Sequence, residues 1–215
     1  MIIAGPSMSG KSTFLKNVLQ QKYTMFNVAF KKIIWCYSES NAKPDISGVT
    51  FHKGMLTNYS NESNQKILII LDDLMTDAYN SSISELFTKG SHHRNTSVIL
   101  VTQNLFHQTS QSRNISLNAK YIVLFKNPRD KQQFSHLARQ IYPENSRELM
   151  RVYKEVMETA HAYFIVDLTQ DCNELLRFRT DIFNQNYLSA CFTSLDQHAI
   201  EPETIKGEQA YAICT

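Results

Sequence analysis

The chain has 215 residues, 42% hydrophobic and 20% charged, which is typical of one sizeable soluble α/β domain. Its 22 basic and 20 acidic residues give a formal net charge of +2, so bulk charge argues neither for nor against nucleic acid. No aliphatic run approaches the roughly 18 residues of a membrane span, and no signal peptide is recognisable. The composition therefore predicts an intracellular protein that is not secreted and does not contact a membrane.

The first dozen residues carry the most informative motif. Residues 5–12 match the phosphate-binding pattern of a glycine, four residues, and then Gly-Lys-Ser/Thr. An apolar run at 2–4 precedes the motif, and apolar residues with helical spacing follow it. In this strand–loop–helix context, backbone N–H groups and the helix N-terminus bind nucleotide phosphates. The candidate nucleotide-binding residues are Gly5, Pro6, Ser7, Met8, Ser9, Gly10, Lys11, Ser12 and Thr13.

Two side chains of this loop have specific expected roles. Lys11 is placed to reach the β- and γ-phosphates, and the Ser12 hydroxyl is placed to bind Mg²⁺. Because almost nothing precedes the loop, we expect either a very short first strand or a natural chain that begins upstream of Met1.

The remaining pattern alternates aliphatic and helix-like segments. Strands are predicted at 32–37, 49–52, 67–71, 97–103, 121–125, 161–167 and 176–180, and helices at 82–89, 129–140 and 147–158. The aliphatic runs lack alternation, which indicates strands covered on both faces of a parallel sheet. We expect an α/β three-layer sandwich with a mostly parallel central sheet over residues 1–184, followed by a polar, partly ordered extension at 185–215.

The strand at 67–71 ends in an acid pair, Asp72 and Asp73. Ligands of parallel α/β sheets bind at the carboxyl edge of the strands, so this Walker B-like pair is predicted to lie beside the phosphate loop. Asp72 is the candidate Mg²⁺ ligand, directly or through water, and Asp73 the candidate to polarise an attacking water. In the alternative interpretation, one or both aspartates only cap the following turn.

Gln103 ends the next strand and should emerge at the same edge, where its amide can contact the γ-phosphate or orient water. The alternative is a polar strand end that faces solvent. Phosphoryl transfer also gains from a cation supplied in cis or by a neighbouring subunit. Arg94 and Arg129 are the candidates for this role, and the alternative for each of them is an ordinary surface charge.

Disulfides, a zinc site and guanine specificity are all disfavoured. The four cysteines are far apart, and His92 and His93 lack a third ligand at metal spacing, so neither disulfides nor a zinc site is expected. Asp45 to Gly48 match a DxxG pattern but lie in a polar loop, and no Asn-Lys-x-Asp segment is present, so guanine specificity is discounted.

Together these motifs resemble the viral DNA-packaging ATPases of the poxvirus type. Those enzymes belong to the FtsK/HerA superfamily and occur also in Polinton-like and adintovirus-like elements. The resemblance spans roughly residues 1–180 and is carried by 5–12, 68–74, 91–106, 113–119 and 123–130. Its most specific parts are Thr-Gln-Asn-Leu-Phe at 102–106 and Phe-Lys-Asn-Pro-Arg-Asp at 125–130.

The resemblance implies a RecA-like, additional-strand core that uses ATP and Mg²⁺. It also implies a homo-oligomeric ring, commonly a hexamer, through which double-stranded DNA is threaded, with capsid proteins as further candidate partners. Such an enzyme would work in the virion or in the host cytoplasm or nucleus. Carried over by motif, Lys11 and Ser12 bind phosphate and Mg²⁺, Asp72 and Asp73 form the Walker B pair, Gln103 is the sensor, and Arg94 and Arg129 are candidate trans-acting fingers.

The sequence therefore favours an ATP-hydrolysing motor that moves double-stranded DNA into a viral or virus-like capsid. Because the net charge is near neutral, DNA contacts would come from local basic groups in the assembled ring. Two alternatives stay open: a P-loop nucleoside or nucleotide kinase, and a domesticated nucleotide-binding protein without turnover.

Overall fold

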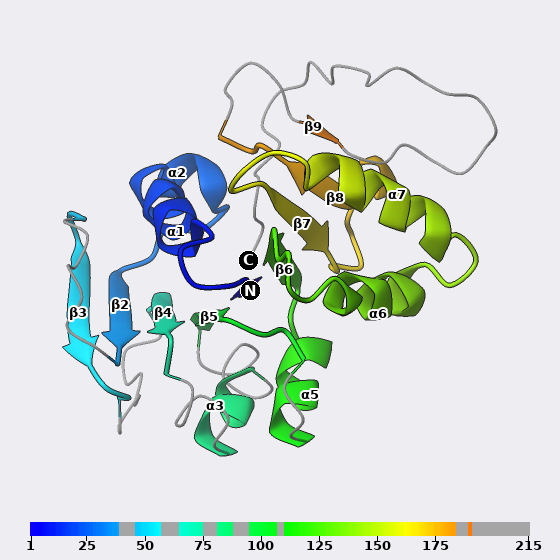
Figure 1. The fold of residues 1–215 in the computed structure, drawn as a ribbon. Helices are drawn as coiled ribbons and strands as arrows, with labels where there is room; N and C mark the ends of the chain where they lie inside the picture. The colour runs from blue at the N-terminus through cyan, green and yellow to red at the C-terminus, as the bar shows by residue number, and fades with distance from the viewer. Residues whose placement is uncertain are drawn as a thin grey trace.

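A computed structural model describes residues 1–38, 46–56, 65–74, 81–87, 95–106, 110–183 and 189–190. Within these ranges one mixed sheet of nine strands carries helices on both faces (Figure 1). The strands are β1 (Ile2–Ala4), β2 (Lys32–Tyr37), β3 (Val49–Lys53), β4 (Ile67–Asp72), β5 (Thr96–Thr102), β6 (Tyr121–Phe125), β7 (Tyr163–Asp167), β8 (Phe178–Thr180) and β9 (Ser189–Ala190). The helices are α1 (Lys11–Gln20), α2 (Lys22–Met25), α3 (Ser81–Glu85), α5 (Ser110–Leu117), α6 (Gln132–Ile141) and α7 (Ser146–Val156), with a 3₁₀ turn at Glu174–Leu176.

The strand order is β3-β2-β4-β5-β1-β6-β7-β8-β9. The first six strands in this order run parallel, and β7, β8 and β9 continue the sheet in antiparallel pairing. Strand β5 lies between β1, which leads into the phosphate loop, and β4, which ends at Asp72, the first residue of the acid pair. This inserted strand is the additional-strand arrangement, so the predicted P-loop NTPase fold is confirmed.

The side chains of β4 show why the protein has three layers. Leu68 and Ile70 pack on the side covered by α1 and α2, whereas Ile69 and Leu71 pack on the side covered by α3, α5, α6 and α7. Figure 1 shows α1 and α2 on one side of the sheet and α3 and α5 on the other. Because both faces of the strand are buried, its sequence is continuously apolar, as in parallel sheets generally.

Helices α6 and α5 differ from the sequence expectation in informative ways. Helix α6 begins at Gln132 rather than at 129, because the Asn127 side-chain oxygen accepts hydrogen bonds from the backbone N–H groups of Arg129 and Asp130 and holds a turn there. Helix α5 was not predicted. Its sequence is mostly polar and Ile115 is its buried hydrophobic residue, so it carries no clear helical stripe.

The C-terminal extension is described only at β9, which pairs with β8 at the end of the sheet. The expected domain boundary after residue 184 falls in 184–188, and these residues, like 191–215, lie outside the described part of the chain. Among the described residues, no helix has both the length and the apolar character needed to cross a membrane.

Gly5 allows β1 and β6 to approach closely at the start of the loop. A Cβ atom on Gly5 would lie 2.6 Å from Cβ of Phe125, a distance that real side chains essentially never show. We therefore expect Gly5→Ala to lower the free energy of unfolding by roughly 1–3 kcal/mol through overpacking. Chemical denaturation would measure this. Ser7→Ala, an exposed position in the same loop, is the control and should change stability by less than about 0.5 kcal/mol. Equal stability of the two variants would contradict the packing argument.

Candidate nucleotide-binding site

The ends of β1, β4 and β5 meet at one edge of the sheet. The backbone N–H of Gly5 donates to the Thr102 carbonyl at 3.2 Å, and that of Asp73 donates to the Val101 carbonyl at 3.3 Å. These bonds connect the loop after β1, the acid pair after β4 and Gln103 after β5 through the backbone. The three predicted motifs are therefore brought together, as expected for the carboxyl edge of a parallel sheet.

The phosphate loop ends in a left-handed glycine. Gly10 has φ +107° and precedes α1 as its N-cap, and a Cβ atom there would also lie 3.3 Å from the Phe125 ring. The first hydrogen bond within the helix runs from the N–H of Phe14 to the Gly10 carbonyl at 2.9 Å. The N–H groups of Lys11, Ser12 and Thr13 are therefore not used by the helix itself. Together with the helix dipole they form a surface suited to an anion.

Lys11 lies across the inside of the loop. Its ammonium donates hydrogen bonds to the carbonyls of Gly5 at 2.6 Å and Pro6 at 2.7 Å. Burial lowers the pKa of Lys11, while the nearby charges of Asp72 and Asp73 act in the opposite direction. A partly desolvated ammonium gains from any further negative charge placed beside it, so this position favours binding of phosphate oxygens.

Asp72 is half-buried and fixed by a residue that the sequence reasoning missed. The indole Nε1 of Trp35 on β2 donates to its Oδ2 at 3.1 Å. Burial raises the pKa of Asp72 and the Asp73 charge adds to this, whereas the Trp35 hydrogen bond and the Lys11 charge lower it. A carboxylate that is desolvated and held in one orientation is well suited to contact a cation. The signal available in the sequence was a lone tryptophan on a strand next to the acidic one.

Asp73 is exposed and stands where the chain leaves β4. Its φ is +51°, a left-handed conformation that is uncommon outside glycine but more accessible to Asp and Asn. Such backbone strain is frequent at functional sites. Residues 75–80, which follow the acid pair and would form the turn of the capping alternative, lie outside the described residues.

Gln103 and Arg129 line one cavity of about 590 Å³ together with Pro6 and Ser7 of the loop. Both Gln103 and Arg129 are exposed. Arg129 thus lies on the same side of the loop as Gln103, within its own chain. Arg94, the other arginine candidate, lies outside the described residues.

A chain of hydrogen bonds links the segment after Gln103 to the turn that carries Arg129. The backbone N–H of Leu105 donates to Gln133 Oε1 at 3.0 Å, and Gln133 Nε2 donates to Asp130 Oδ2 at 2.9 Å. Asp130 N–H in turn donates to Asn127 Oδ1 at 3.2 Å. Gln133 on α6 therefore holds the two segments together, and the sequence pattern gave no sign of this role.

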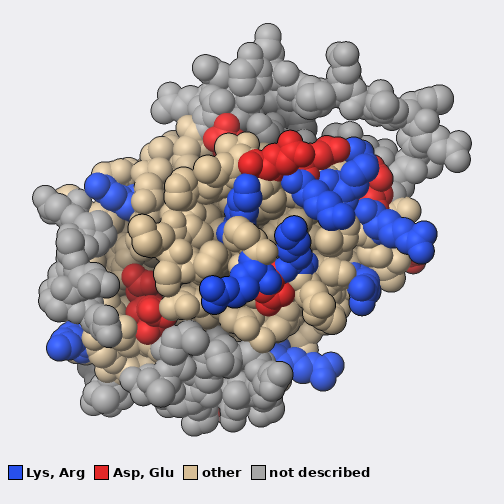
Figure 2. All heavy atoms as spheres, in the orientation of Figure 1, with Lys and Arg blue, Asp and Glu red and all other residues tan. Residues whose placement is uncertain are grey.

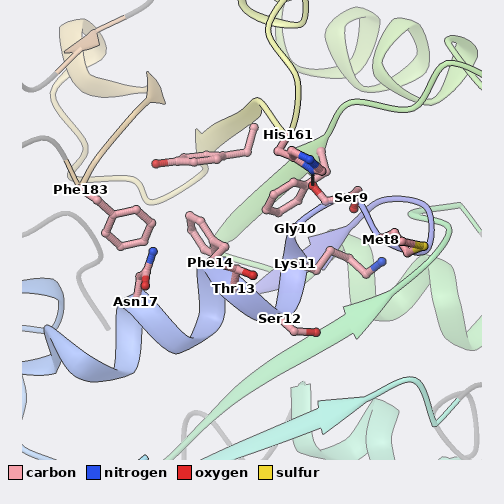
Figure 3. A pocket seen from close by; sticks show the side chains of 12 residues that line it. Met8, Ser9, Gly10, Lys11, Ser12, Thr13, Phe14, Asn17, His161 and Phe183 are labelled. Carbon is pink, nitrogen blue, oxygen red and sulfur yellow. Dashed lines mark hydrogen bonds between the residues drawn. The ribbon is translucent and has the colours of Figure 1, made fainter. Parts of the chain in front are cut away.

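A second cavity, of about 570 Å³, lies on the α1 side of the loop (Figure 3). Residues 8–13 form one wall, and His161 and Phe183 contribute to the others. The His161 Nδ1 lies 3.3 Å from the Ser9 carbonyl, which connects the start of β7 to the loop. The volume of this cavity falls within the roughly 300–1,000 Å³ typical of small-molecule sites.

The donor set at the sheet edge suits magnesium better than a metal held by protein alone. The described residues contain no group of three or more His, Cys, Asp or Glu side chains that could hold a metal ion. Mg²⁺ is instead commonly bound by one or two carboxylates together with phosphate oxygens and water. Asp72, fixed by Trp35, and the exposed Ser12 hydroxyl in the first turn of α1 supply hard oxygen donors of this kind.

Comparisons with known proteins give a structural likeness only. No protein-family model matches the sequence, and no curated protein matches it. The chain is similar to the genome packaging NTPase B204 from Sulfolobus turreted icosahedral virus 2 in complex with ATP-gammaS, at 16% identity and TM-score 0.46. It is also similar to B204, the DNA-packaging ATPase from Sulfolobus turreted icosahedral virus, at 15% identity and TM-score 0.49. Each alignment covers 83% of this chain and 94% of the other. The fold assignment rests on the strand order and loop geometry described above.

Proposed function

We propose that this protein hydrolyses ATP with Mg²⁺. The observation that carries the proposal is the shared sheet edge, where a phosphate-loop lysine, an acid pair and a strand-end amide follow three neighbouring strands. Triphosphate hydrolysis needs these parts together: donors for the phosphates, a carboxylate for the metal, and a group that orients water.

Each residue then has a distinct role. The N–H groups at the start of α1 and the Lys11 ammonium bind the phosphates. Ser12 and Asp72 would hold Mg²⁺, which would supply positive charge to the phosphate oxygens. Asp73 orients the attacking water and accepts its proton. Gln103 contacts the γ-phosphate or that water.

We further propose that Arg129 supplies positive charge in cis, since it lines a cavity with the loop of its own chain. Arg94 stays the candidate for a finger supplied in trans. This assignment leaves the two arginines with separable roles, one within the subunit and one between subunits.

The finer proposal is a motor that moves double-stranded DNA into a viral or virus-like capsid as a homo-oligomeric ring, commonly a hexamer. Its support is the order of motifs, above all the segments at 102–106 and 125–130. Lys and Arg side chains gather over α6 and α7, with acidic side chains among them (Figure 2). Such local basic groups fit the expectation that DNA contacts come from particular surfaces rather than from net charge. The protein would act in the virion or inside the host cell.

The fate of the γ-phosphate tests the proposed reaction against its two alternatives. ATP labelled at the γ-position is incubated with the full chain and Mg²⁺, with and without added nucleosides and nucleoside monophosphates. Hydrolysis predicts release of inorganic phosphate at a rate independent of these acceptors. Transfer of label to an acceptor would favour the kinase alternative, and binding without any release would favour a nucleotide-binding protein without turnover.

Gln133 provides a test of the geometry around Gln103. We expect Gln133→Leu to lower kcat by roughly ten-fold with little change in ATP affinity, because a misplaced catalytic group costs rate while the loop still binds the phosphates. Steady-state phosphate release measures both parameters. Gln132→Leu is the matched control, since this neighbouring side chain is exposed and makes none of the linking hydrogen bonds. Equal kcat in the two variants would contradict a positioning role for Gln133.

A further inference from the structure

We infer that the cavity on the α1 side of the loop binds the base of the nucleotide, and that Asn17 selects adenine there. The inference rests on the proposed function in one respect: it takes a triphosphate to be bound at the loop. Residues 10–13 line this cavity and also present the N–H groups for the phosphates. If the phosphates of a nucleotide bind at the start of α1, the cavity lies next to them and can accept the sugar and base.

Aromatic side chains form the apolar part of the cavity. The Phe14 ring makes edge-to-face contacts with Tyr163, at a centroid distance of 4.8 Å, and with Phe183, at 5.2 Å. The backbone N–H of Ile182 donates to the Tyr163 hydroxyl at 2.9 Å, which fixes the segment that carries Phe183. A planar base stacks favourably on such rings whatever its hydrogen-bonding groups, so this wall supplies affinity without selection.

Asn17 supplies the selective contact. It lies one helical turn beyond Thr13 on α1, a rise of about 6 Å along the axis. Its amide points into the cavity toward Phe183 (Figure 3). The described residues make no hydrogen bond with this side chain, so neither the donor nor the acceptor of its amide is used by them.

An asparagine amide matches adenine better than guanine at the N7 edge. Adenine presents the N6 amine as donor beside the N7 acceptor, and one amide satisfies both. Guanine presents O6 and N7 at the same edge, both acceptors, so the amide oxygen is left facing an acceptor. The cavity is thus suited to an adenine nucleotide, in agreement with the absence of a guanine-reading Asn-Lys-x-Asp segment.

Equilibrium binding of four ligands to the full chain tests the inference: ATP, 7-deaza-ATP, GTP and inorganic tripolyphosphate, each with Mg²⁺. For the unmodified chain we expect ATP to bind about ten-fold more tightly than GTP and than 7-deaza-ATP, which lacks the N7 acceptor. Asn17→Leu should remove both preferences. Phe183→Leu should weaken ATP and GTP by the same factor, roughly five- to ten-fold. Gln20→Leu, an exposed amide on the same helix outside the cavity, should change nothing.

Tripolyphosphate distinguishes a failure of base recognition from a failure of phosphate binding, because it occupies the loop without a base. All variants should bind it equally, which also shows that each variant is folded. If tripolyphosphate binds but the unmodified chain binds 7-deaza-ATP or GTP as tightly as ATP, the assignment of Asn17 is overturned while the proposed function stands. An unchanged ATP preference in Asn17→Leu has the same consequence. If no triphosphate binds at all, the proposed function fails and this inference fails with it.

Discussion

Asp73→Asn is expected to leave ATP binding nearly unchanged while lowering turnover by roughly 10²–10⁴-fold, the usual contribution of a general base. An amide cannot accept a proton from water, so the chemical step loses its base. Asparagine tolerates the left-handed φ of +51° that Asp73 adopts, so the backbone at the end of β4 is preserved. The substitution therefore isolates the carboxylate. Phosphate release and equilibrium ATP binding measure the two effects separately.

Asp171→Asn is the control for this experiment. Asp171 is also exposed but lies in the turn before the 3₁₀ segment, away from the loop, and its replacement should leave turnover at the unmodified rate. If Asp73→Asn also kept turnover within about three-fold of the unmodified chain, a general-base contribution would be excluded. Asp73 would then only shape the turn after β4.

Lys11→Ala is expected to weaken triphosphate binding strongly and to lower turnover by roughly 10²–10³-fold, as for removal of a preorganised donor at developing charge. The substitution removes the cation and both of its hydrogen bonds to the loop carbonyls. Calorimetric binding of ATP and steady-state phosphate release would measure the loss. Lys16→Ala, on the same helix but outside the lining of both cavities, should behave as the unmodified chain. ATP affinity retained in Lys11→Ala would contradict the loop assignment.

The role of the Lys11 charge also predicts how ATP binding depends on pH. Because burial lowers the pKa of Lys11, the ammonium of the free protein loses its proton at a lower pH than an ordinary lysine does. Phosphate binding favours the charged form, so above that pKa binding must also take up a proton. ATP affinity should therefore fall as pH rises through the lowered pKa of Lys11, and this loss should be absent in Lys11→Ala.

The phosphate loop could be predicted from the sequence because its chemistry is local. A glycine is needed at position 10 for a left-handed backbone, and Lys11 follows it at a fixed spacing on the helix. The strand order could not be derived from periodicity in the same way. The insertion of β5 between β1 and β4 was expected only through the family resemblance, and the antiparallel pairing of β7, β8 and β9 depends on tertiary packing.

The residues that support the site could not be predicted either, because their roles depend on contacts between distant segments. Trp35 was assigned to a buried strand, but its hydrogen bond to Asp72 depends on the pairing of β2 with β4, which sets Tyr37 opposite Asp72. Asn17 lies among the apolar residues of α1 and Gln133 near the start of α6, and neither position belongs to a motif. Partners of this kind become visible only when the register and the approach of distant segments are fixed.

ATP turnover by the full chain with and without double-stranded DNA, recorded alongside particle mass, decides whether the protein is a DNA-driven motor. For a motor we expect that DNA stimulates hydrolysis and that an assembled ring carries it out. The same rate with and without DNA, from a protein that stays monomeric at high concentration, would contradict the motor.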